Sequence, residues 1–173
     1  MIPCVVPAYL RKPHGDFSLL YAVWLRDYWA RTGDLTVVRD CLPAAEATLN
    51  SEAWTNSRSD LWDGDERARL FICWGVNNGI RLLAENGPVA ILRIAAHRAA
   101  ADHYETHGQP ANAAQHRNRA ETVRQLAVER LWLAGEGRFS PGTLGGHHFP
   151  HTSPHTDVLA LAFGVLPPHL EPK

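Results

Sequence analysis

One segment limits the fold of this chain more than any other: the run from Val89 to His107 predicts a helix that is apolar on nearly every face. Pro88 suits the first turn of that helix, and Gly108 suits its end. The apolar side chains cover much more than the single stripe of a surface helix. Such a helix is buried on more than one side, so we expect it to pack between other helices. The pattern predicts an all-α fold.

A second helix is predicted from Asp16 to about Thr32, because apolar residues follow helical spacing there without an internal Gly or Pro. Asp16 or Ser18 can cap its first amide groups. Gly33 can take the left-handed conformation that ends a helix, and Asp34 can cap the next one. A turn this short makes the two helices antiparallel neighbours.

The remaining helices follow from the same spacing. The helix after Asp34 carries apolar residues at helical offsets, but Pro43 lies within it and should kink or split it. Pro110 begins a helix that runs to about Trp132 with one apolar stripe, so this helix has a solvent face. A last apolar stretch covers Val158 to Leu166.

Two long segments separate these helices. Residues 50–86 mix tryptophans with acidic residues, and only Leu70 to Trp74 has the pattern of a strand. Residues 135–155 form a loop rich in Gly, Pro and His. Loops this long are uncommon in a compact domain unless they have a function. We therefore expect a single domain over residues 1–173, built from antiparallel helical hairpins with long loops on one face.

The charge balance excludes several classes of partner. Seventeen Lys and Arg oppose eighteen Asp and Glu, which gives a net charge of −1. A field this weak disfavours nucleic acid and anionic membrane surfaces as partners. No apolar run approaches the roughly 20 residues of a transmembrane helix. The three cysteines lack the spacing of metal ligands, and we expect no metal and no cofactor.

Three ordered segments resemble the six-hairpin glycosidase barrel of α-L-rhamnosidase-type enzymes, and together they cover almost the whole chain. The first is similar to a family helix that opens with Asp-aromatic-Ser and turns at Thr-Gly-Asp. The second is similar to an aromatic loop that leads into an Ala-rich helix. The third is similar to the next helix, a short loop and an Ala-Leu-Ala-x-x-x-Gly helix. In this chain they read DFSLLYAVWLRDYWARTGDLTVVRDCLP, LFICWGVNNG with AENGPVAILRIAAHRAAADHYETHG, and HRNRAETVRQLAVERLW with GRF and SPHTDVLALAFGVLPP.

This resemblance implies part of an (α/α)6 six-hairpin toroid that lacks both ends of the barrel. It also implies a glycoside hydrolase that cleaves terminal α-L-rhamnosyl or related bonds with inversion, in which an acid protonates the leaving oxygen and a base activates water. The family's general acid lies before the matching segments and its general base after them. The acidic run around Glu66 occurs at the wrong place in the order, so no acid role is assigned to it. We expect the isolated chain to be inactive and to self-associate through exposed barrel edges.

Five residues are predicted to bind a carbohydrate substrate. Aromatic faces stack on sugar rings, and carboxylates accept hydrogen bonds from sugar hydroxyls. Asp16 matches the family residue at the start of a barrel helix that faces the cavity, although it can equally be a helix cap. Trp74 and the acidic loop can also be core and solvated surface, respectively. The five residues are Asp16, Trp62, Asp65, Trp74 and Glu85.

Two further features qualify this prediction. Cys73 stands where the family commonly has an Asp, and a thiol cannot accept two strong hydrogen bonds from a sugar diol. The histidines of the late loop lack the spacing of a helical metal pair, and they are either surface residues or contacts to sugar hydroxyls. These histidines are His147, His148, His151 and His155.

A non-catalytic helical module that binds carbohydrate or a protein partner is the competing function. A paired acid and base across one cavity would separate the two, and the sequence names no such pair. The beginning of the chain shows no signal peptide. A cytoplasmic location is expected if Met1 is the natural start, and secretion stays open if residues precede it.

Overall fold

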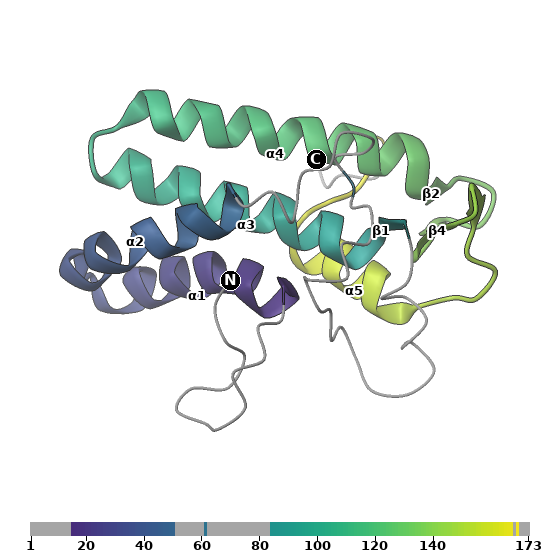
Figure 1. The fold of residues 1–173 in the computed structure, drawn as a ribbon, viewed down its shortest axis with the longest axis horizontal. Coiled ribbons are helices and arrows are strands. Elements are labelled where there is room, and N and C mark those ends of the chain that lie inside the picture. Colours follow the sequence, from purple (N-terminus) through teal and green to yellow (C-terminus); the bar gives the residue numbers. More distant parts are fainter. Residues whose placement is uncertain (1–14, 51–60, 62–83, 168, 170–173) are drawn as a thin grey trace, which may run out of the picture.

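The computed structural model describes residues 15–50, 61, 84–167 and 169. Five helices make up most of this part of the chain, which confirms the all-α class. Figure 1 shows two antiparallel hairpins side by side, with a shorter fifth helix at one end. Trp62, Asp65, Cys73 and Trp74 lie outside the described residues, as does the strand expected at 70–74.

The first hairpin consists of α1 (Gly15–Thr32) and α2 (Leu35–Leu49). Gly33 joins them with a φ of 71°, a conformation that favours glycine. The Asp34 carboxylate accepts hydrogen bonds from the backbone amides of Thr36 at 2.9 Å and Val37 at 3.2 Å. These contacts confirm the turn and the cap that the sequence predicted.

Pro43 does not split α2, so that part of the expectation was wrong. A proline within a helix removes the amide that would bond to the carbonyl four residues earlier, here that of Arg39. Both Arg39 and Pro43 are exposed, so the missing hydrogen bond lies on the solvent side of the helix. The helix therefore continues to Leu49.

The second hairpin consists of α3 (Gly87–Thr106) and α4 (Pro110–Leu131). Gly108 ends α3 with a φ of 68°. As predicted, α3 is buried on nearly all sides, and it packs against each of the other four helices. The buried positions of α4 form one stripe: Ala113, His116, Ala120, Val123, Ala127 and Leu131.

The core lies on both sides of α3. One cluster joins α3 to α1 and α2 through side chains such as Leu19, Val23 and Leu49. The other joins α3 to α4 and to the C-terminal part through Ile91, Val123 and others. Helix α3 thus packs against the first hairpin on one side and against α4 and the C-terminal part on the other, which explains why its sequence has no polar face.

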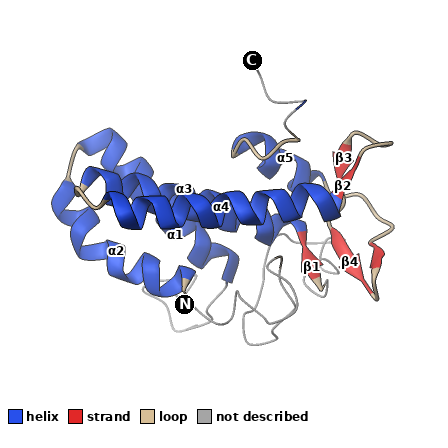
Figure 2. Cartoon of the chain, turned by 90° about the horizontal axis from the view of Figure 1, so that it is seen from above, coloured by secondary structure: helices blue, strands red, loops and turns tan. Residues whose placement is uncertain are grey.

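Short strands lie within or next to the two segments that were expected to be loops. They are β1 (Glu85–Asn86), β2 (Trp132–Leu133), β3 (Arg138–Phe139), β4 (Gly142–Leu144) and β5 (His147–His148). β4 pairs with both β1 and β5, and β2 pairs with β3, all antiparallel. Figure 2 shows this region at the end of the bundle where α3 begins.

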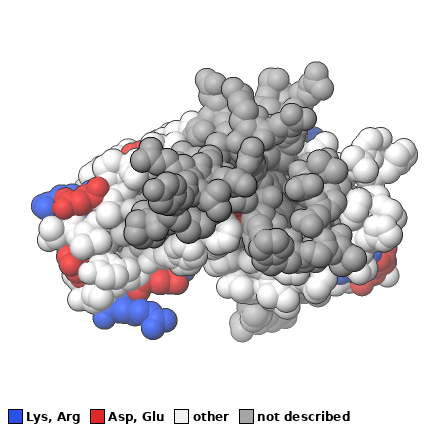
Figure 3. Space-filling model, turned by 60° about the horizontal axis from the view of Figure 1, so that its bottom comes forward, with Lys and Arg blue, Asp and Glu red and all other residues white. Residues whose placement is uncertain are grey.

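The last helix, α5 (Pro154–Ala162), begins earlier than the apolar stretch from Val158. Pro154 occupies its first turn, where the missing amide has no cost. None of the described helices combines the length and the apolar character needed to cross a membrane. On the face drawn in Figure 3, the described acidic and basic side chains lie near one another, which agrees with the small net charge.

Candidate functional site

A cleft of about 250 Å³ lies where α1, α3 and α5 begin. Helix α1 contributes Asp16, Phe17 and Leu20 to the lining, and α3 contributes Pro88 and Leu92. Helix α5 contributes His155, Val158 and Leu159.

The start of α3 is held firmly beside this cleft. The buried Asn86 caps the helix, since its side-chain oxygen accepts the backbone amide of Val89 at 3.1 Å. The amide of Gly87 donates to the carbonyl of Pro141 at 2.8 Å. Pro88 follows in the first turn and lines the cleft. Its ring fixes the backbone φ angle at this position.

The start of α5 is anchored through a different set of bonds. The Asp157 carboxylate accepts the backbone amide of Phe139 at 2.9 Å, which ties the first turn of α5 to β3. Ser153 occupies the N-cap position and is almost fully buried. These contacts fix the helix turn that carries His155 and Val158 into the cleft lining.

Two polar side chains lie in an otherwise apolar lining. Asp16 is 5% exposed, and its carboxylate sits in the first turn of α1, where the helix dipole stabilises a negative charge. His155 is half-buried in the first turn of α5. A carboxylate that accepts hydrogen bonds and an imidazole that both donates and accepts, set against apolar walls, suit a small ligand with hydroxyl groups and an apolar face.

Of the predicted site residues, Asp16 lines this cleft and Glu85 does not. Glu85 lies in β1, and its side chain contacts α4 and β4. Its carboxylate binds Arg130 of α4 at 2.6 Å and accepts a hydrogen bond from Thr143 of β4 at 3.2 Å. This carboxylate raises the pKa of Arg130 through its hydrogen bond and its charge. Glu85 therefore joins α4 to the small sheet, and a role in substrate binding stays a prediction.

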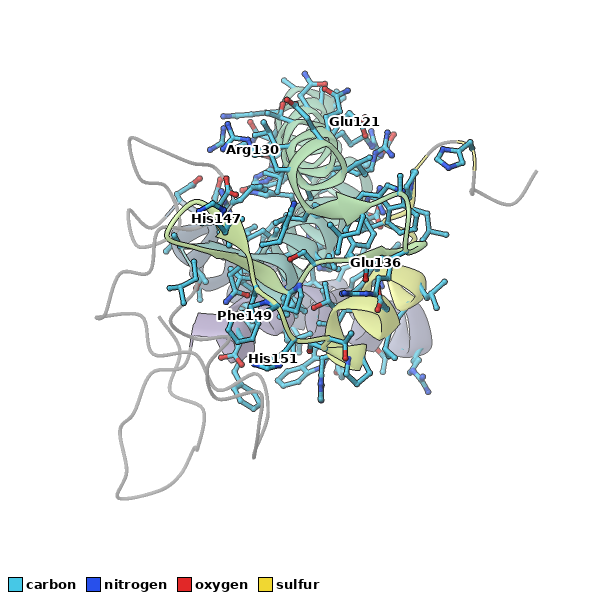
Figure 4. All side chains as sticks on the ribbon, turned by 90° about the vertical axis from the view of Figure 1, so that its right-hand side faces the viewer. Glu121, Arg130, Glu136, His147, Phe149 and His151 are labelled. Atoms are coloured by element: carbon cyan, nitrogen blue, oxygen red, sulfur yellow. The ribbon has the colours of Figure 1, made fainter. Side chains whose placement is uncertain are left out.

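The histidines of the late segment separate into two groups. His147 and His148 are exposed on β5, and the His151 ring contacts Phe149 edge-on with centroids 5.3 Å apart. Figure 4 shows His147 in the β4–β5 hairpin, away from Phe149 and His151. His155 alone of the four lines the cleft. The Ser-Pro pair before it is a helix-start signal that could have identified this position.

A second cavity, of about 470 Å³, was not foreseen from the sequence. It lies between β2, β3 and α5 and is lined by Trp132, Phe139 and Leu161, among others. Its charged residues already have partners: Arg138 pairs with Glu136, labelled in Figure 4, and Asp157 binds the backbone of β3. These bonds give the cavity's polar rim a structural role.

Within the described ranges, no three His, Cys, Asp or Glu side chains come close enough together to hold a metal ion. Comparison with known proteins found no matching family model, no matching curated protein and no matching solved structure.

Proposed function

We propose that this chain forms part of a six-hairpin glycosidase barrel of the α-L-rhamnosidase type, and that the cleft beside Asp16 is its contribution to the carbohydrate site. One observation carries the proposal. The sequence resemblance assigns Asp16 to the start of a barrel helix that faces the cavity, and Asp16 lines a cleft where three helices begin.

The chemistry of the cleft supports a sugar ligand. A hexose presents hydroxyl groups at its rim and C–H groups on its ring faces. The nearly buried Asp16 carboxylate can accept hydrogen bonds from hydroxyls, and charge-assisted bonds of this kind are stronger than neutral ones. Phe17, Leu20 and Leu159 supply apolar surface for the ring face. The ligand class in this proposal is a terminal α-L-rhamnosyl or a related sugar.

The arrangement of helices supports a partial toroid. Two antiparallel hairpins lie side by side, and α5 would be the first helix of a third. Large apolar side chains remain exposed on both outer helices. Trp24 and Tyr28 of α1 are 53% and 40% exposed, and Val158 and Leu161 of α5 are 60% and 67% exposed. In a closed ring, neighbouring hairpins would cover these side chains.

Catalysis in this proposal requires groups beyond those we assign. An inverting glycosidase uses a carboxylic acid and a carboxylate that are about 6.5–9.5 Å apart. Asp16 is assigned to substrate binding and to neither catalytic role. The isolated chain is accordingly proposed to bind the sugar without turnover.

A non-catalytic module that binds carbohydrate is the second candidate, and the bonds of two carboxylates favour it. Glu85 is tied to Arg130 and Thr143, and Asp157 is tied to the backbone of Phe139. Glu85 and Asp157 thus serve structure. Binding at the Asp16 cleft belongs to both candidates, and turnover separates them.

Calorimetric titration with methyl α-L-rhamnoside tests the proposal. The wild-type chain should bind in the millimolar range, which corresponds to about −4 kcal/mol. Asp16→Asn should weaken binding roughly tenfold, since a charged acceptor contributes about 1.5–3 kcal/mol. Asp27→Asn is the matched control, because Asp27 is an exposed acid on the same helix. Unchanged binding by Asp16→Asn, or equal losses in both variants, would contradict the proposal.

A further inference from the structure

Two histidines meet in the interior of the second hairpin, at the middle of α3. His97 of α3 and His116 of α4 face each other with their Nδ1 atoms 2.9 Å apart. They are 4% and 6% exposed, and their ring centroids are 5.2 Å apart. This direct contact crosses the interface of the two longest described helices.

The groups around the pair are themselves buried or charged. Tyr104 stacks on His116 with centroids 5.4 Å apart and an interplanar angle of 14°. Its hydroxyl is hydrogen-bonded to Glu46 of α2. Burial raises the pKa of Tyr104 most, and the hydrogen bond and the charge of Glu46 raise it further. The charges that act on the two imidazoles come from three helices: Glu46 of α2, Arg93 of α3 and Arg119 of α4.

The contact constrains the protonation of both rings. A hydrogen bond between two Nδ1 atoms needs one N–H donor and one lone pair. When both rings are protonated the lone pair is lost, and two cations face each other in the core. Burial, followed by the charges of Arg93, His116 and Arg119, lowers the pKa of His97 to about 3. Burial also lowers the pKa of His116, although the Glu46 carboxylate opposes this.

We propose that the His97–His116 pair is a pH-sensitive latch on the α3–α4 hairpin: it holds the helices together while at least one ring offers a lone pair, and it releases them in acid. Release separates the part of α4 around His116 from α3 and exposes both rings to water. This latch does not depend on the proposed sugar site.

The direction of the pH dependence follows from proton uptake. In the open hairpin the rings titrate near the ordinary histidine pKa of about 6.5. In the closed hairpin His97 takes up a proton only near pH 3. Open molecules therefore bind more protons throughout the interval between these values, and acid favours opening. For His97 alone, the opening equilibrium rises roughly 25-fold from pH 7 to pH 5.

Amide hydrogen exchange of the full chain measures this opening. After correction for the intrinsic exchange rate, the opening equilibrium of α4 amides around His116 should rise at least roughly 25-fold between pH 7 and pH 5. The variant carrying His97→Asn and His116→Asn keeps amide groups that can bond to each other but cannot titrate. It should lose that rise. His147→Asn, which replaces an exposed histidine on β5, should keep it.

No rise in the wild type, or an equal rise in the double variant, would overturn the proposal. If the double variant does not fold, ¹⁵N spectra of the wild-type rings give an independent test. The His97 ring should stay neutral at pH 5 in molecules whose hairpin is closed. Titration of His97 near pH 6.5 in the closed hairpin would also overturn the proposal.

Discussion

Replacing Gly87 by alanine should destabilise the fold, because this glycine lies where three elements approach one another. A Cβ atom at this position would lie 2.8 Å from the carbonyl oxygen of Ser140 and 2.8 Å from Cγ2 of Thr156. The carbonyl oxygen of Pro141 would be 3.2 Å away. These atoms belong to the β3–β4 connection and to α5, and the same glycine donates its amide to Pro141.

The size of the expected loss of stability depends on which of the contacting atoms can move away from the added Cβ. Two of the contacts are with backbone oxygens, so relief requires a shift of the β3–β4 connection. Inserting one carbon into a packed site typically costs about 1–3 kcal/mol. The higher helix propensity of alanine offsets up to about 1 kcal/mol of this cost. We expect a net loss of about 1–2 kcal/mol, which lowers the melting temperature of a chain this long by roughly 2–8 °C.

Differential scanning calorimetry of Gly87→Ala and Gly135→Ala provides the measurement. Gly135 is the matched control, because a Cβ there meets nothing within 4 Å. Its replacement should change the melting temperature by less than about 2 °C. A Gly87→Ala chain that melts at or above the wild-type temperature would refute the steric reasoning, and with it the close packing of α3 against α5 beside the cleft.

Three other outcomes are expected. Asn86→Ala removes a buried helix cap and should lower the free energy of unfolding by about 1–2 kcal/mol in a urea titration. Arg130→Met, which breaks the partly exposed ion pair with Glu85, should change it by less than about 1 kcal/mol in the same titration. The exposed apolar side chains of α1 and α5 should cause self-association, which sedimentation velocity detects as species heavier than a monomer. A single monomeric species across concentrations would contradict the open-ring proposal.

The helices could be predicted because their signals are local. Gly33 with Asp34, and Gly108 with Pro110, mark the ends and starts of neighbouring helices within a few residues. The all-round apolar pattern of α3 likewise predicts burial without reference to its neighbours. In contrast, the split expected at Pro43 does not occur, and both Pro43 and Arg39 lie on the exposed side of α2.

Contacts between distant segments could not be predicted. Strand β1 pairs with β4 across the whole α3–α4 hairpin, and strands of two or three residues leave no periodic pattern. The meeting of His97 with His116 depends on the register of two helices. His155 reaches the cleft only because α5 packs beside the starts of α1 and α3. For Asp16, the family resemblance implied a cavity position, but the partners across the cleft follow from tertiary packing alone.

An NMR titration of the ¹⁵N-labelled chain with methyl α-L-rhamnoside tests the central proposal most directly, because it locates the ligand as well as detecting it. Backbone shifts should concentrate on the residues that line the cleft, including Asp16 and Phe17 of α1, Leu92 of α3 and His155 of α5. They should saturate at millimolar ligand, in line with a binding free energy of about −4 kcal/mol. Shifts that concentrate elsewhere, or an unchanged spectrum at ligand concentrations about tenfold higher, would contradict the assignment of this cleft as a carbohydrate site.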